Sequence, residues 1–310
     1  MGLFWWILIA LVFLALLAAL AAYICYRMCF VAVAEEAGEY PVPKGKIYIP
    51  YREQMITWMK ETRQLPCREM SITSFDGLQL LGKFYEYAPG APIELMMHGY
   101  RGLAERDLCG GVQRCFALGH SALLVDQRAC GQSQGKVITF GILESRDCLS
   151  WIDHIRNTFC EDVKIILTGI SMGASTVLIA AGQDLPENVI GVLADCGFSS
   201  AKEIIKKVIR QMKLPAWLLY PFVKLGAKLY GGFDLDETSA AEAVKHCKIP
   251  VIIFHGENDN FVPCYMSKTI FDHCPSRKRL VTIPDAGHGL CCMVDTERYI
   301  SELKDFFGNK

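Results

Sequence analysis

The chain begins with a long apolar run and then alternates short apolar segments with amphipathic ones. Residues 3–26 are 24 consecutive residues drawn only from Ala, Leu, Ile, Val, Phe, Trp, Tyr and Cys. As a helix this run is about 36 Å long, more than the roughly 30 Å hydrocarbon core of a bilayer. The pattern predicts a transmembrane helix, and residues 1–27 are interpreted as a membrane anchor. A cleaved signal peptide is the alternative, because the Ala-rich stretch 18–22 contains small residues suited to cleavage.

Aromatic and basic residues at the ends of this run predict its orientation. Aromatic side chains typical of a membrane interface occupy both ends, at Trp5 and Trp6 and at Tyr23 and Tyr26. By the positive-inside rule, the end of a membrane helix that is flanked by basic residues faces the cytosol. All basic residues near this run follow it, so the rest of the chain is predicted to be cytosolic. These basic residues are Arg27, Lys44, Lys46 and Arg52.

Residues 28–66 have a mixed pattern, with Pro41 and Pro43 followed by helical spacing around 52–63. This segment is predicted to be a tether and a leading helix. Residues 67–310 then form the main domain. Asp76-Gly77 is a strong hairpin signal between the first two strands of that domain.

Short apolar runs separated by helical segments predict a mostly parallel sheet that is covered on both faces. The fold class is therefore α/β. Between the strand ending near Asp195 and the strand at Val251 lie about 55 residues, which is more than one crossover needs. A helical cap inserted at about 199–235 explains this length, and an ordinary helix pair on the sheet surface is the alternative. The predicted strands are 71–75, 78–87, 93–97, 122–125, 163–168, 189–194, 251–254 and 280–283.

Composition removes several classes of function. With 32 basic and 33 acidic residues and a net charge of −1, the chain lacks the basic excess of a nucleic-acid binder. Its 14 cysteines include no Cys-x-x-Cys pair, so neither a metal site nor a disulfide framework is predicted. The cysteines are expected to be reduced thiols. No cofactor is expected.

Two segments match Gly-x-Ser-x-Gly, one at 131–135 and one at 169–173. Ser171 directly follows a predicted strand and begins a helix of small residues, as a nucleophile elbow requires. Ser133 lies in a polar loop. Ser171 is therefore the predicted nucleophile, and Ser133 is interpreted as a loop residue.

A serine nucleophile needs a base, and the base needs an orienting carboxylate. His288 lies in a glycine-flanked loop just past the last strand, and Asp259 follows the strand before it. The chain order Ser171, Asp259, His288 is the one expected for this type of triad. Asp195, at the end of an earlier strand, is the alternative acid. The remaining histidines are interpreted as structural or surface residues: His98, His120, His154, His246, His255 and His273.

The oxyanion formed in such a reaction needs two backbone donors. One is predicted to be the N–H of Met172, next to the nucleophile. The second is assigned to Tyr100, in the loop after the strand 93–97. His98 is interpreted as a structural support for that loop.

These ordered motifs resemble the α/β-hydrolase superfamily. The resemblance covers roughly residues 66–308. Within the superfamily, the set of motifs is similar to that of the single-pass hydrolases grouped near the serine-aminopeptidase-like esterases. It implies an eight-stranded sheet with the catalytic residues at its C-terminal edge. Ala129-Cys130 departs from the usual loop sequence of the family, which concerns the shape of the loop. The motifs are Met97-His98-Gly99, Asp126 to Gly135, the elbow at Ser171, Gly256 to Asp259 and Gly287-His288-Gly289.

The function predicted from these features is a membrane-anchored serine hydrolase that cleaves esters or thioesters through an acyl-enzyme. The alternatives are a peptidase of aminopeptidase type and a catalytically inactive binding module on the same fold. Apolar residues of the cap predict a pocket for an apolar acyl group above Ser171. They are Ile204, Ile205, Ile209, Trp217, Leu218, Leu219, Tyr220 and Phe222.

Overall fold

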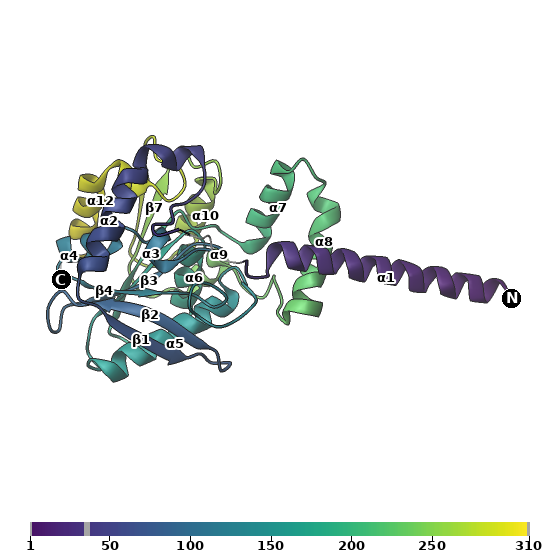
Figure 1. Cartoon of the computed structure of the whole chain (residues 1–310), viewed down its shortest axis with the longest axis horizontal. Helices are drawn as coiled ribbons and strands as arrows, with labels where there is room; N and C mark the ends of the chain where they lie inside the picture. Colours follow the sequence, from purple (N-terminus) through teal and green to yellow (C-terminus); the bar gives the residue numbers. More distant parts are fainter. Residues whose placement is uncertain (1, 34–37, 309–310) are drawn as a thin grey trace.

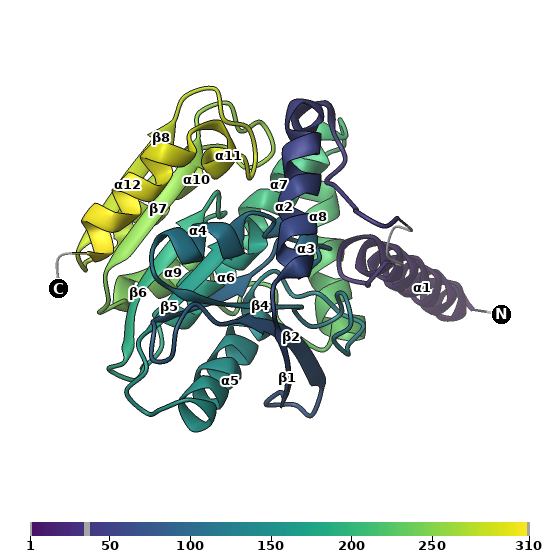
Figure 2. The same ribbon diagram turned by 60° about the vertical axis from the view of Figure 1, so that its left-hand side comes forward.

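A computed structural model describes residues 2–33 and 38–308 of the chain. Its centre is one eight-stranded sheet with the strand order β1-β2-β4-β3-β5-β6-β7-β8 (Figures 1 and 2). Strand β2 is antiparallel to both of its neighbours, and the other pairs are parallel. The predicted fold class is confirmed. The strands are β1 Arg68–Thr73, β2 Gln79–Tyr85, β3 Ile93–Met97, β4 Ser121–Val125, β5 Ile165–Ile170, β6 Val189–Asp195, β7 Val251–Gly256 and β8 Lys278–Ile283.

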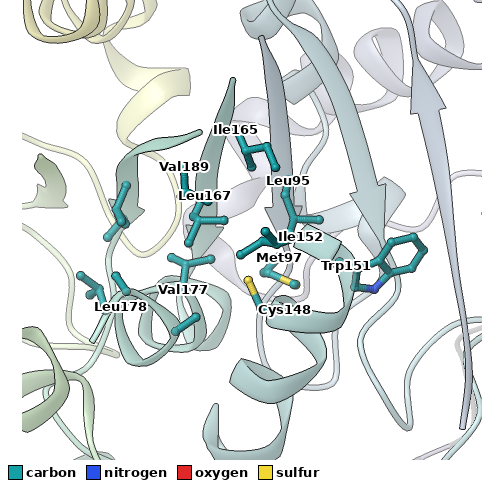
Figure 3. Close-up of a cluster of buried hydrophobic side chains, with 14 of the residues drawn as sticks. Leu95, Met97, Cys148, Trp151, Ile152, Ile165, Leu167, Val177, Leu178 and Val189 are labelled. Carbon is teal, nitrogen blue, oxygen red and sulfur yellow. The ribbon is translucent and has the colours of Figure 1, made fainter. Parts of the chain in front are cut away.

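Helices cover both faces of the sheet. The larger cluster of buried side chains joins one face to α5, α6 and α10, and Figure 3 shows part of it around Leu95, Leu167 and Trp151. On the opposite face, separate clusters join the strands to α4 and α12. The strands are apolar on both faces because both are buried, which explains their continuous hydrophobic runs. The bounds are α4 Gly111–Ala117, α5 Ile142–Thr158, α6 Met172–Ala181, α10 Tyr265–His273 and α12 Thr296–Phe307, with short helices α3 Ala104–Asp107, α9 Ala240–Ala243 and α11 Cys291–Val294.

Helix α1, Leu3–Cys29, extends away from the sheet and is exposed along most of its length (Figure 1). It is long and apolar enough to cross a membrane. Its C-terminal end is fixed to the domain, where Phe30 is buried between the rings of Phe140 and Phe233. Val31 also forms a β-bridge with Val137.

The segment predicted as a tether contacts the domain at separate points in its described part, through partly buried side chains such as Tyr40, Val42 and Tyr48. Residues 34–37 of that segment lie outside the described residues. A 3-10 helix, Lys46–Tyr51, leads into α2, Arg52–Gln64, whose Met55 and Met59 are buried against Leu290. The leading helix predicted around 52–63 is present. The division of the chain at residue 66 stays a prediction.

The interval between β6 and β7, for which a cap is predicted, contains two helices that form a hairpin, and we call this hairpin the cap. They are α7, Ala201–Gln211, and α8, Ala216–Gly226, with a π-helical turn at Ala227–Gly231. Figure 1 shows both helices beside the C-terminal part of α1. The cap therefore packs against the part of α1 that lies near the domain.

Candidate active site

Ser171 occupies a sharp turn between β5, which ends at Ile170, and α6, which begins at Met172. Its backbone has φ 55° and ψ −118°, a sparsely populated conformation that costs about 1–3 kcal/mol and concentrates at functional sites. Its glycine neighbours permit this turn. A Cβ on Gly173 would lie 2.1 Å from the carbonyl oxygen of Met97, and one on Gly169 would lie 2.2 Å from that of Gly173. The spacing of the motif thus has a steric cause.

The structure brings the three predicted triad residues together. His288 Nε2 lies 2.9 Å from Ser171 Oγ, and His288 Nδ1 lies 2.7 Å from Asp259 Oδ2. An ionised carboxylate can only accept hydrogen bonds, so Nδ1 carries a proton and donates a hydrogen bond to Asp259. Nε2 is then left to accept a hydrogen bond from the serine hydroxyl. This arrangement is the one that a serine nucleophile and its base require.

Asp259 is held as a carboxylate by donors that surround it. Its Oδ1 accepts hydrogen bonds of 2.8 Å from the backbone N–H groups of Phe261 and Val262. Burial alone would raise the pKa of Asp259, but His255, His288 and the Val262 N–H lower that pKa below its usual range. The carboxyl therefore stays ionised at neutral pH.

His255 is a contact of the triad that the sequence did not predict. It is fully buried, as a packed residue was expected to be, and its Nε2 lies 2.8 Å from the carbonyl oxygen of Val262 and 3.5 Å from Asp259 Oδ2. Its Nδ1 lies 2.6 Å from Ser267 Oγ. His255 thus supports the loop that carries Asp259. The four-residue spacing of His255 and Asp259 was the one available signal.

Asp195, the alternative acid, is bonded elsewhere. Its Oδ2 accepts a 3.0 Å hydrogen bond from the hydroxyl of Tyr299, and its Oδ1 is buried with no hydrogen-bond partner among the described residues. Burial raises the pKa of Asp195. The hydrogen bond to His288 Nδ1 is made by Asp259.

Two backbone N–H groups near Ser171 are available to an oxyanion. Within the described residues, neither the N–H of Met172 nor that of Tyr100 donates a hydrogen bond to another group. A Cβ built on Gly99 would lie 3.5 Å from Ser171 Cβ, so the Tyr100 loop runs beside the serine. The carboxylate of Asp107 fixes this loop by accepting a 3.1 Å hydrogen bond from the Gly99 N–H.

The other residues considered from the sequence have structural contacts. Ser133 Oγ donates to the carbonyl of Asp126 at 2.5 Å and accepts from the Leu81 N–H at 2.9 Å, so it joins a loop to β2. His98 is buried, and its Nε2 accepts a 2.9 Å hydrogen bond from the Gln127 N–H. The geometry agrees with the structural interpretation of both.

A cavity of about 230 Å³ opens beside Ser171 and His288, and Met55 and Trp58 of α2 line it. Among the described residues, none that lines it belongs to α7 or α8. The prediction of a pocket beneath the cap is therefore wrong for this cavity. The inward residues of the cap, Ile204, Ile205, Ile209 and Tyr220, are buried against the domain. Four charged residues also line the cavity, Arg106, Asp107, Arg114 and Asp195. The apolar residues that line it are Pro43, Met55, Trp58, Met96, Leu108, Ile170, Leu193, Phe261 and Met293.

Cys196, Asp259 and His288 are the group of possible metal ligands that the described residues contain, with ligand atoms within 4.8 Å of one another. Two of the three are already hydrogen-bonded within the triad. Burial raises the pKa of the Cys196 thiol well above its ordinary value, which disfavours the thiolate that a metal would need. The donor set fits a catalytic triad better than a metal centre.

Comparison with curated proteins finds distant relatives. The uncharacterized protein YqkD of Bacillus subtilis is 27% identical over 193 residues, which are 62% of this chain and 63% of that protein. The protein bem46 of Schizosaccharomyces pombe is 24% identical over 193 residues, 61% of this chain and 58% of that protein. The chain thus spans less than two thirds of the length of these relatives.

Comparison with solved structures identifies the same fold. The esterase Pf2001 of Pyrococcus furiosus superposes with a TM-score of 0.67 at 20% identity, covering 90% of this chain and 97% of that one. Est1E of Butyrivibrio proteoclasticus, solved with ferulic acid, gives a TM-score of 0.59 at 19% identity, covering 77% and 100%. At these identities the likeness concerns the fold.

Family models agree with the architecture and with the position of the elbow. A model described as the alpha/beta hydrolase fold matches residues 95–247, which include the strands β3 to β6 and Ser171. A second, described as serine hydrolase (FSH1), matches residues 221–290, which include Asp259 and His288. The chain belongs to the α/β-hydrolase superfamily.

Proposed function

We propose that this hydrolase is a serine hydrolase that cleaves carboxylic esters or thioesters through an acyl-enzyme. The observation that carries the proposal is the continuous chain of hydrogen-bond contacts from Ser171 through His288 to Asp259, at 2.9 and 2.7 Å. The strained turn at Ser171 supports the same role, because it exposes the hydroxyl at the end of a strand.

In this mechanism Ser171 Oγ attacks the carbonyl carbon of the substrate while His288 Nε2 takes the hydroxyl proton. Asp259 keeps the imidazole oriented and stabilises its positive charge. The N–H groups of Met172 and Tyr100 donate to the oxyanion. The protonated His288 then gives its proton to the leaving alcohol or thiol. Water, deprotonated by the same histidine, releases the acid and restores the serine.

We place the acyl group in the cavity on the α2 side of Ser171. Its wall is mainly apolar, with Met55 and Trp58 from α2 and Leu193 from β6. Each methylene group buried there contributes at most about 0.8 kcal/mol, so medium acyl chains should react faster than acetyl. An apolar acyl group is therefore the expected substrate, bound against α2 in a cavity that α7 and α8 do not line.

Fluorophosphonate labelling of the full chain tests the assignment of the nucleophile. Ser171→Ala should abolish labelling and ester hydrolysis, because no other hydroxyl contacts His288 Nε2 among the described residues. Ser133→Ala is the matched control with the same local motif, and it should still be labelled. Loss of labelling in both folded variants, or its persistence in Ser171→Ala, would refute the proposal.

A panel of p-nitrophenyl esters and aminoacyl anilides tests the class of substrate. We expect kcat/KM to increase from acetate to octanoate, and Met55→Trp should reduce the octanoate value selectively by filling the cavity. Ile204→Ala in the cap should not change the preference, since Ile204 does not line the cavity. Faster cleavage of aminoacyl anilides would favour the peptidase, and a folded chain without labelling or turnover would favour the inactive module.

We further propose that α1 anchors the domain in a membrane with the domain in the cytosol. The support is the apolar length of α1 and the exposed Arg27 in its last turn. Protease added to intact cells should leave the domain uncut. Digestion of the domain would indicate the opposite topology, and a shortened N-terminus on the mature chain would indicate a cleaved signal.

A further inference from the structure

Helix α8 is apolar on two opposite sides. One side is buried in the domain at Ala216, Tyr220, Val223 and Ala227, a spacing of three to four residues that defines one helical face. The other side of α8 and of the turns that flank it is exposed to solvent. This outer stripe consists of Leu214, Trp217, Leu218, Leu225 and Leu229, with Trp217 79% and Leu229 57% exposed.

At about 100° per residue, the outer stripe is on the side of α8 away from the domain core. It continues onto the preceding turn through Met212, which is 52% exposed. A contiguous apolar surface of this kind marks an interaction site on a soluble domain. The question is which partner covers it.

The position of α1 identifies that partner. Gly226 of α8 contacts α1 so closely that a Cβ there would lie 2.4 Å from the carbonyl oxygen of Ala22. The hydroxyl of Tyr230 donates a 3.1 Å hydrogen bond to the carbonyl of Ala19. Figure 1 shows α1 passing α8 and continuing away from the sheet. The outer stripe is therefore on the side of the cap toward which α1 extends.

The length of α1 sets the depth of α8. From Leu3 to Ala22 the helix rises about 29 Å, which equals the roughly 30 Å thickness of a hydrocarbon core. The crossing of the two helices then lies where the hydrocarbon ends. Tyr23, Tyr26 and Tyr230 cluster at this level, with ring centroids 5.2 Å apart for Tyr23 and Tyr230. Tyrosines gather at membrane interfaces.

Charged residues next to the outer stripe are of the type found at a membrane interface. Lys213 directly precedes it, Lys228 lies beside its last residue, and both are exposed. Lysines at this depth can reach phosphate groups while the leucines and the tryptophan remain among the acyl chains.

We propose that the outer stripe of α8 is a membrane-docking surface that is inserted in the same leaflet from which α1 emerges. This inference rests on the proposed membrane anchor. The cap hairpin then lies flat in the interface, with its apolar face about 5–10 Å deep, and the domain is held against the bilayer at two places.

Quenching of tryptophan fluorescence by brominated phosphatidylcholine tests this proposal in nanodiscs that each hold one full chain. The chain has five tryptophans, two of them in α1. In a Trp5→Phe/Trp6→Phe variant, Trp217 should be quenched, with loss of about a third of the emission because it is one of three remaining tryptophans. Adding Trp217→Phe should remove this quenching. Bromine at carbons 6 and 7 should quench Trp217 more than bromine at carbons 11 and 12.

A single Trp217→Phe variant reports on the anchor separately, because Trp5 and Trp6 remain. If these are quenched but Trp217 is not, α1 is in the bilayer and the docking surface is refuted. If neither is quenched, the anchor and the docking surface both fail. Cross-linking of two chains through the stripe in liposomes, with Trp217 unquenched, would assign the stripe to a second copy. Fluorophosphonate labelling should be the same in all variants, so the proposed chemistry is tested independently.

Discussion

Asp195 and Asp259 lie at the ends of the neighbouring strands β6 and β7, and both are buried. Their protonation is nevertheless driven in opposite directions. Asp259 accepts hydrogen bonds from two backbone N–H groups and from His288, and its pKa is lowered. Asp195 has one hydroxyl donor, Tyr299, and its pKa is raised by burial. Hydrogen-bond donors and histidines outweigh burial at Asp259, whereas burial outweighs the hydrogen bonds at Asp195, and the two pKa values shift in opposite directions.

The largest expected effect is on catalysis at Asp259. Asp259→Asn should lower kcat by about 10³–10⁴-fold, because the amide can donate to Nδ1 and so favours the wrong tautomer of His288. Steady-state hydrolysis of a p-nitrophenyl ester measures this loss. Near-normal turnover in a folded Asp259→Asn variant would show that the contact between Asp259 and His288 does not serve catalysis.

The next effect concerns stability as a function of pH. The pKa of Asp259 is lower in the folded state, so its stabilising contribution is present above the ordinary aspartate pKa of about 3.9 and is lost as pH falls below it. The pKa of Asp195 is raised, so its ionisation opposes folding increasingly as pH rises above about 3.9.

Urea unfolding of the two asparagine variants between pH 2.5 and 8 measures this contrast. Asp259→Asn should lose about 1–3 kcal/mol relative to the wild type from neutral pH down to about pH 4, and less at pH 2.5. Asp195→Asn should equal or exceed the wild type at pH 8, with its advantage decreasing toward pH 4. Parallel curves for both variants would contradict the assigned pKa directions.

The smallest effect is expected on catalysis at Asp195. Because its carboxyl is bonded to Tyr299 and makes no hydrogen bond to His288, Asp195→Asn should change kcat/KM by less than about tenfold. The same ester assay measures it. A loss as large as that of Asp259→Asn would make Asp195 the acid that serves His288 during turnover.

Much of this arrangement could be predicted from the sequence because it is local. The eight strands were predicted from continuous apolar runs, and Ser171 from a strand directly followed by small residues. The order of Asp259 and His288 depends only on which strand precedes each of them. The triad positions were therefore predicted as candidates, and the structure brings them within hydrogen-bond distance.

The position of the cavity beside Ser171 could not be predicted from the sequence. The cavity is lined by Met55 and Trp58, more than 110 residues before Ser171, and their pattern shows an amphipathic helix without showing its partner. The prediction that apolar cap residues line the pocket was wrong for the same reason. Ile204 and Trp217 are both apolar, but one is buried in the domain and the other is exposed. Local periodicity cannot distinguish a face that lines a cavity from one that packs or remains outside.

The fixed end of α1 has a consequence for the order in which the molecule is assembled. The carbonyl of Cys29 accepts a 2.7 Å hydrogen bond from the Tyr100 hydroxyl, and that of Met28 accepts one of 2.8 Å from Arg101. The contact with Gly226 comes later still in the chain. At about 5–20 residues per second, ribosomes need roughly 10–40 s to make the 204 residues that separate Ala22 from Gly226.

The packing of α1 is therefore complete only after α8, which follows much later in the chain, has been synthesised. During that interval, the hydrogen-bond donors to the carbonyls of Met28 and Cys29 are not yet all synthesised. The same is true of the rings that bury Phe30. A bulky substitution at Gly226 should consequently appear as a defect in the packing of α1, although the altered residue lies 204 positions after Ala22.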